Sequence, residues 1–123
     1  MPKLVEMDEH VTFAQQLNCE AGPIILINVF TVATEEGEQF LQAWTADAGY
    51  MMLQPGFISA QLHRGVGGSG VFVNYAVWES IEDLKRAFYN PDFQSGLRHY
   101  PLSTVASPHL FQKVVVPGIC ADR

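Results

Sequence analysis

Two polar side chains, Asn74 and Trp78, lie in an apolar run of the chain that has the pattern of a strand. Because side chains alternate between the two faces of a strand, Asn74, Trp78 and Phe72 share one face. A buried amide without a hydrogen-bond partner costs about 1–3 kcal/mol. Asn74 is therefore expected to be satisfied by a neighbouring strand or a buried water, or else by a ligand. In the same way, Trp78 is either a core aromatic residue or the wall of a binding site.

A second amide, Asn28, lies between Ile27 and Val29 in another apolar run. On a strand it shares a face with Leu26 and Phe30. Asn28 therefore has the same two interpretations as Asn74, and it can face the same cavity.

Other residue types that could do chemistry give weaker patterns. The sequence contains four histidines, which are too dispersed to indicate a metal site: His10, His63, His99 and His109. For His63 and His109 a structural role is favoured. The two cysteines, Cys19 and Cys120, lack metal-ligand spacing, and we expect free thiols. The sequence thus predicts neither a metal nor a cofactor.

Composition limits the classes of function. A chain of 123 residues with 48% hydrophobic and 16% charged residues is predicted to form one folded domain. A net charge of −6 argues against nucleic acid, because phosphate binding needs a basic surface. No apolar run is long enough to span a membrane, and the first ten residues lack the apolar core of a signal peptide. We expect a cytoplasmic protein.

The pattern of the chain predicts alternating strands and helices. Strands are expected at residues 24–32, 57–64, 71–78 and 109–116. One helix is expected from Thr34 to the Pro55-Gly56 stop, and a second after Ser80, with a short continuation through Leu97. The order β-α-β-β-α-β predicts an α+β, ferredoxin-like fold with a four-stranded antiparallel sheet and both helices on one face. Residues 1–22 are interpreted as an N-terminal arm with a short helix, 23–117 as the domain and 118–123 as a tail.

The second face of the strand at residues 71–78 predicts a partner. It carries only Val71, Val73, Tyr75 and Val77, and both helices are expected on the other side of the sheet. An exposed apolar face of this kind usually marks an interaction surface. We therefore expect a homodimer in which two sheets pack face to face.

Several segments, in this order and spacing, resemble the antibiotic biosynthesis monooxygenase (ABM) domain. They are Pro55-Gly56-Phe57-Ile58-Ser59-Ala60, Leu62-His63-Arg64, Asn74-Tyr75-Ala76-Val77-Trp78-Glu79-Ser80 and His109-Leu110-Phe111. The resemblance covers roughly residues 23–117 and implies a dimeric α+β barrel. Members of the family include cofactor-free oxygenases of phenols, haem-degrading enzymes, isomerases and proteins without a known reaction.

Two subgroups of the family differ in their site residues. Haem-degrading members resemble this chain at Asn28, but their Trp and His positions correspond here to Ala87 and Leu97. A shift of the alignment would instead bring in His99. Quinone-forming oxygenases resemble the chain at Asn74 and Trp78.

The quinone-forming oxygenases also have an Arg beyond the second helix, which corresponds here to Arg98, whereas their Tyr falls at Leu84. This resemblance implies a cofactor-independent monooxygenase that uses molecular oxygen on a small aromatic or quinol-like metabolite. Asn74 would hold a substrate oxygen, Trp78 would form a wall and Arg98 would favour an anion. Residues expected to shape the substrate site are Asn28, Trp44, Met51 and Phe72. The alternatives are an isomerase or haem-linked enzyme on the same scaffold, and a non-catalytic binding or stress-related module.

Overall fold

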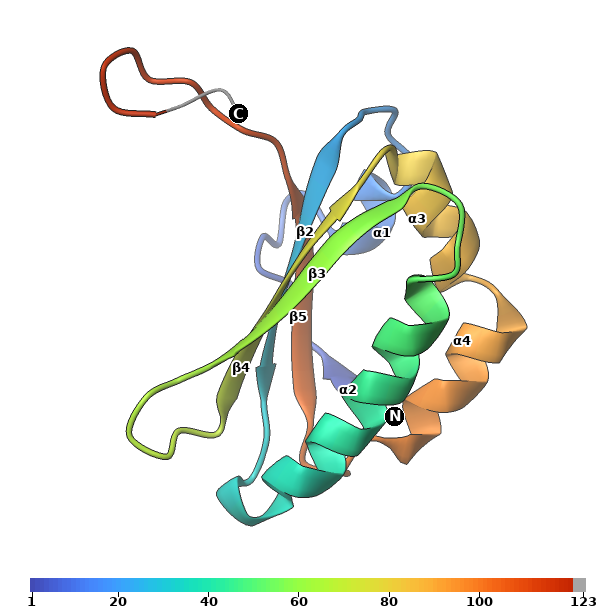
Figure 1. The fold of residues 1–123 in the computed structure, drawn as a ribbon, viewed down its shortest axis with the longest axis vertical. Coiled ribbons are helices and arrows are strands. Elements are labelled where there is room, and N and C mark those ends of the chain that lie inside the picture. Colours follow the sequence, from blue (N-terminus) through green and yellow to red (C-terminus); the bar gives the residue numbers. More distant parts are fainter. Residues whose placement is uncertain (121–123) are drawn as a thin grey trace.

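The computed structural model describes residues 1–120 as one sheet with helices against one of its faces (Figure 1). The strands are β1 (Lys3–Leu4), β2 (Ile24–Thr31), β3 (Phe57–Arg64), β4 (Val71–Trp78) and β5 (Val105–Phe111). The helices are α1 (Phe13–Gln16), α2 (Gly37–Met51), α3 (Ile81–Phe88) and α4 (Pro91–Gly96), with 3₁₀ turns η1 (Thr34–Glu36) and η2 (Leu97–His99). Within residues 1–120, no helix has both the length and the apolar character needed to cross a bilayer.

The strand order is β1-β5-β2-β4-β3. The four long strands are antiparallel to their neighbours and give the predicted ferredoxin-like arrangement. The sheet has one strand more than predicted, because Lys3–Leu4 of the N-terminal arm pairs in parallel with Val105 and Ala106 of β5. The arm is thus partly built into the sheet.

The last strand was predicted at residues 109–116, and this prediction is wrong by four residues at its start. β5 runs through Pro108, while the apolar run Val114–Val116 is exposed in the segment that leaves the sheet. The strand tolerates Pro108 because its nitrogen faces the outer edge, as do the Ala106 carbonyl and the Leu110 N–H on either side. No ladder hydrogen bond is lost there. Further along this edge, the Gln16 side chain takes the place of a neighbouring strand in hydrogen bonding. Its amide accepts a hydrogen bond from Leu110 N–H at 2.9 Å and donates one to Leu110 O at 3.0 Å.

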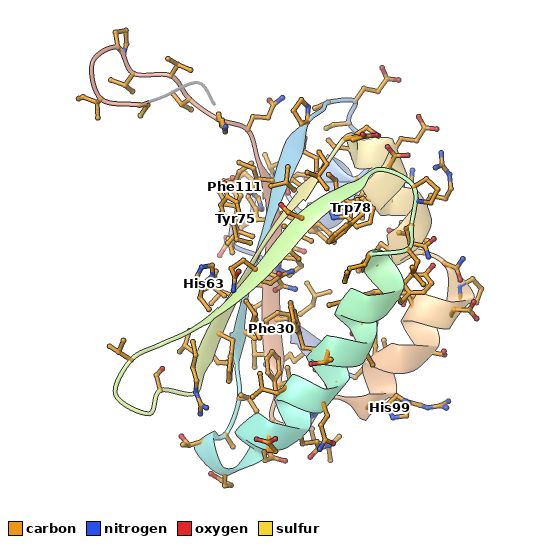
Figure 2. All side chains as sticks on the ribbon, in the orientation of Figure 1. Phe30, His63, Tyr75, Trp78, His99 and Phe111 are labelled. Atoms are coloured by element: carbon orange, nitrogen blue, oxygen red, sulfur yellow. The ribbon has the colours of Figure 1, made fainter. Side chains whose placement is uncertain are left out.

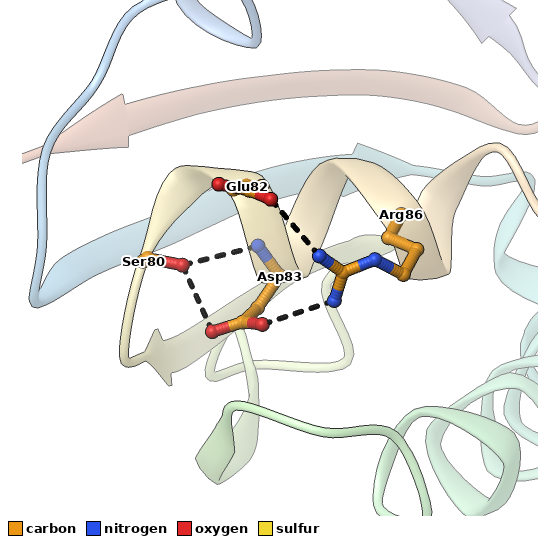
Figure 3. Close-up of polar contacts among 4 residues, drawn as sticks. All are labelled: Ser80, Glu82, Asp83 and Arg86. Carbon is orange, nitrogen blue, oxygen red and sulfur yellow. Dashed lines mark hydrogen bonds and ion pairs between the residues drawn. The ribbon is translucent and has the colours of Figure 1, made fainter.

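Helix α3 begins at Ile81, directly after its predicted N-cap Ser80. The Ser80 Oγ accepts a hydrogen bond from the Asp83 N–H and donates one to Asp83 Oδ2 (Figure 3). Arg86 pairs with Asp83 and Glu82 one turn later, at 3.2 and 3.1 Å. Gly56 packs against Asp83 with φ of +88°, where a Cβ atom would meet the carboxylate. These contacts hold the end of β4 in a fixed position relative to α3.

The two faces of the sheet have different surroundings. Figure 2 shows Phe30 and Trp78 between the sheet and the helices, and His63, Tyr75 and Phe111 on the opposite side. Tyr75 and Phe111 are 38% and 37% exposed, and they belong to an outer face that also carries Ile25, Ile27, Val29, Val73 and Val77. This outer sheet face is the one from which a homodimer was predicted, and in the single chain it is without a helical layer.

Candidate functional site

A cavity of about 150 Å³ lies between the sheet and the helices. It separates two clusters of buried side chains. One cluster includes Trp78 and Leu84, and the other includes Phe30 and Tyr100. All four of these residues line the cavity, together with residues of β2, β4, β5 and α2. The core is therefore interrupted at its centre by a space with mostly apolar walls.

The two predicted amides lie side by side in this wall. Asn28 of β2 is directly opposite Asn74 of β4 in the sheet register. Both line the cavity, and the Oδ1 atom of each is buried without a hydrogen-bond partner in the protein. Each such group costs about 1–3 kcal/mol. Residues 1–120 hold four others, on Asp47, Tyr50, Thr104 and His109, but only the two amides are paired in the sheet register. Two of them at one point favour the ligand interpretation of Asn74 and Asn28 over the structural one.

Three of the residues expected at the site line the cavity with apolar side chains. Trp78 is 1% exposed, lines the cavity and packs edge-to-face on Phe57 with ring centres 5.4 Å apart. Trp44 and Met51 line the cavity from α2, where a spacing of seven residues places them on one helix face. These three residues can give an aromatic ligand a flat and apolar surface.

Two of the predicted site residues do not line the cavity. Phe72 is buried in the second core cluster, where it stacks on Phe40 at 4.5 Å and lies under Arg64 at 5.0 Å. Arg98 is exposed on η2 and is not part of the wall. The 3₁₀ turn begins at Leu97, which does line the cavity, and the next residue is directed to the surface. The structure thus brings Asn74 and Trp78 together without Arg98.

The sequence reasoning missed two ionisable residues in the wall, Asp47 of α2 and Tyr100 after η2. Asp47 Oδ2 is buried without a hydrogen-bond partner. Burial raises the pKa of the Asp47 carboxyl, and the neighbouring Tyr100 hydroxyl and His99 partly oppose that shift. Burial also raises the pKa of Tyr100, and the negative charge of Asp47 adds to this effect. A signal for Asp47 was present, since an acid at position 47 interrupts the apolar stripe Trp44, Ala48, Met51.

The N-terminal arm forms one side of the cavity. Met1, Pro2 and Leu4 are among the lining residues, and β1 holds this segment beside β5. The chain end marked N lies near α2 and α4 in Figure 1. The arm therefore narrows the space that the domain alone would leave.

The histidines lie elsewhere. His63 Nδ1 is 3.3 Å from the Val73 carbonyl on the outer sheet face, and His109 Nε2 is 3.2 Å from the Gln16 amide. His99 is exposed beyond α4 (Figure 2). Cys19 and Cys120 are free and exposed. Within residues 1–120, no three side chains of His, Cys, Asp or Glu gather in a group able to hold a metal ion.

Comparisons with known proteins agree with this geometry. Residues 23–98 match the model of the ABM family, antibiotic biosynthesis monooxygenase. SnoaB from Streptomyces nogalater, a cofactor-independent oxygenase, superposes with a TM-score of 0.69 at 24% identity over 80% of this chain and 99% of its own. A candidate monooxygenase from Shewanella loihica PV-4 gives 0.66 at 27% identity, over 77% of this chain and 97% of its own. No match was found among the curated proteins.

Proposed function

Because the chain belongs to the antibiotic biosynthesis monooxygenase family, we propose that it is a cofactor-independent monooxygenase of small phenolic aromatics. The observation that carries the proposal is the pair of unpartnered amides, Asn28 and Asn74, in an otherwise apolar cavity. The likeness to SnoaB, described as a cofactor-independent oxygenase, supports the class of reaction.

The size of the cavity limits the substrate. An apolar cavity of about 150 Å³ is enough for a single aromatic ring. With some movement of the exposed N-terminal arm, we propose a substrate of about one or two fused rings. The amides would bind its oxygen atoms, and Trp78, Trp44 and Met51 would enclose its ring.

The chemistry follows from the reactivity of phenols. Triplet oxygen reacts slowly with closed-shell molecules, but an electron-rich phenolate can pass an electron to it. With 1-naphthol as an example, one O₂ is consumed, one oxygen atom enters the ring to give 1,4-naphthoquinone, and the other leaves as water. The protein must bind the ring, favour the phenolate and keep bulk water out. Apolar walls with two amides can bind the ring and keep bulk water out.

We also propose that the protein acts as a homodimer in the cytoplasm. The uncovered outer sheet face, with Tyr75 and Phe111 more than one third exposed, supports sheet-to-sheet pairing. A dimer of this kind would be a barrel whose two cavities lie outside the shared interface, on the helical sides. The free thiols of Cys19 and Cys120 agree with a reducing compartment.

The test is oxygen consumption with a bound phenol. Binding of 1-naphthol is measured by quenching of the Trp44 and Trp78 fluorescence, and turnover by an oxygen electrode and by mass spectrometry with isotopically labelled O₂. We expect one labelled oxygen atom in each quinone formed, and loss of turnover in Asn74→Ala. Saturable binding of 1-naphthol without oxygen uptake would contradict the monooxygenase and favour the non-catalytic binding module.

A further inference from the structure

Among residues 1–120, Asp47 is the one acidic side chain in the wall of the cavity. It lies on the face of α2 that also presents Trp44 and Met51, and its Oδ2 atom is buried without a partner. On the other side, the carboxylate is confined by α4, because a Cβ atom at Gly96 would be 2.9 Å from Asp47 Oδ1. Asp47 Oδ1 thus lies close to α4. The Tyr100 hydroxyl is a hydrogen-bonding neighbour of the carboxylate, and Oδ2 is left without a partner.

The charges around Asp47 do not neutralise it. Within residues 1–120, the ion pairs are those of Arg86 with Glu82 and Asp83, so no Lys or Arg pairs with Asp47. Around it, η2 and the residue after it bring His99 and Tyr100, and the polar side chains of the strands in the wall are the neutral amides of Asn28 and Asn74. The N-terminal arm brings Met1, Pro2 and Leu4. α3 presents Leu84 and Phe88 to the cavity, α4 presents Phe93, and β5 presents Ala106 and Pro108.

A carboxylate in this position is a poor structural element. Burying an unpaired charge destabilises a fold, and buried acids that serve stability are paired or fully hydrogen-bonded. Asp47 has no Lys or Arg partner, the Tyr100 hydroxyl and the His99 ring compensate its charge only in part, and burial raises its pKa. A raised pKa makes a carboxylate a stronger base and brings it closer to the pKa of a phenol, as a general base at neutral pH requires.

We propose that Asp47 is the catalytic base that takes the hydroxyl proton from a phenolic substrate bound by Asn28 and Asn74. This inference rests on the proposed function and assigns the proton step that the function needs. The O–H bond of the phenol breaks, its electron pair stays on the phenolate oxygen, and a new O–H bond forms at Asp47 Oδ2.

The total charge of the cavity does not change in this step. One negative charge moves from Asp47 to the substrate, where it is delocalised over the ring. The amide groups of Asn28 and Asn74 can then donate N–H hydrogen bonds to the phenolate, since a side-chain amide presents either its oxygen or its nitrogen. This accounts for a site that stabilises an anion without Arg98 in its wall.

The test uses 4-nitrophenol, whose phenolate is coloured and whose neutral form is not. Saturating protein is mixed with the probe at a pH where the free probe is mostly neutral, and binding is followed in parallel by tryptophan fluorescence. The variants are Asp47→Asn, which keeps the shape of the side chain, and the matched control Asp92→Asn, at an exposed acid on α4. Infrared difference spectra of the wild type report whether a protonated carboxyl appears on binding, and this measurement does not depend on a variant that folds.

We expect coloured phenolate in the complexes of the wild type and of Asp92→Asn, and a phenolate-to-phenol ratio lower by at least about tenfold in Asp47→Asn, a change of one pKa unit or more. A new carboxylic acid band should accompany binding to the wild type. Binding with equal colour in Asp47→Asn, or a colourless wild-type complex, would overturn the role of Asp47 and leave the phenol site intact. No binding of either 4-nitrophenol or 1-naphthol to the wild type would overturn the phenol site and the role of Asp47 together.

Discussion

Replacing Asn74 by leucine should make the protein more stable and inactive at the same time. In the wild type, the Asn74 Oδ1 is buried without a partner and faces a cavity of about 150 Å³. Leucine has nearly the same size as asparagine and no polar atom. It removes the unpaired group and adds apolar contacts, and the cavity gives it the room that a packed core would not.

The size of the effect follows from the unpaired oxygen. Removing one buried unsatisfied group relieves about 1–3 kcal/mol. For a domain of this length, 1 kcal/mol corresponds to about 3–6 °C in Tm, which gives an expected increase of about 3–18 °C. Asn74→Ala removes the same amide but enlarges the cavity, so it should be less stable than Asn74→Leu. Because Asn28 lies directly opposite, the double variant Asn28→Leu/Asn74→Leu should deviate from additivity.

The assay combines thermal unfolding with binding of 1-naphthol, each measured on the wild type and on all variants. We expect a higher Tm and at least about tenfold weaker binding for Asn74→Leu, since one polar contact to a bound phenol is lost. A lower Tm for Asn74→Leu would refute the reasoning, because it would mean that the amide is satisfied inside the protein. A higher Tm with unchanged binding would mean that the unpaired Asn74 amide does not contact the ligand.

The remaining predictions concern other parts of the molecule. Because the pKa of Asp47 is raised, the folded state binds its proton more tightly than the unfolded state does. This group therefore contributes stability below its ordinary pKa of 3.8, and the contribution is lost as the pH rises through the pKa of the folded state. Urea titrations from pH 4 to 8 should show the wild type losing stability relative to Asp47→Asn as the pH rises. Val73→Asp should convert a dimer to a less stable monomer in light scattering, whereas Ser95→Asp on the exposed side of α4 should leave the mass unchanged, and a monomeric wild type at micromolar concentration would contradict the dimer. Gly96→Ala should displace the Asp47 carboxylate by a few tenths of an ångström and lower the phenolate fraction of bound 4-nitrophenol with little change in Tm. Titration with hemin should give no sharp Soret shift, and a stoichiometric complex whose spectrum changes in a His99 variant would support the haem-linked alternative.

The strands next to the Gly-rich hairpin could be predicted to the residue. β3 and β4 have the bounds expected from sequence, Phe57–Arg64 and Val71–Trp78, because Pro55-Gly56, the Gly-rich loop and Ser80 delimit them. β5 could not be predicted in the same way. Its Pro108 argues against a strand, and the run Val114–Val116 favours one. However, β1 pairs only with Val105 and Ala106, so the outer side of β5 has no partner strand at Pro108, and the sheet ends before the valines.

The candidate site was predictable where it follows strand alternation. The face shared by Asn74 and Trp78, and the matching position of Asn28, follow from a period of two residues and from the pairing of β2 with β4. Arg98 and Phe72 depended on the path of the chain after α3 and on how the core divides around a cavity, and neither can be read from local pattern. Asp47 was overlooked because only the apolar residues of its helical stripe were considered, and Trp44 and Met51 were taken from that stripe as walls of the site.

The two ends of the chain are not equivalent as points of attachment. Met1 and Pro2 line the cavity, and the segment behind them is held by hydrogen bonds from Lys3 N–H to Thr104 O and from Val5 N–H to Ala106 O, both 2.9 Å long. A bulky fusion ahead of Met1 would lie beside these lining residues, so we expect it to disturb the segment and to open or obstruct the cavity. The segment after β5 leaves the sheet on the side away from the helices (Figure 1). A purification tag or a surface linker placed after that segment stays clear of the cavity, although it emerges beside the outer sheet face.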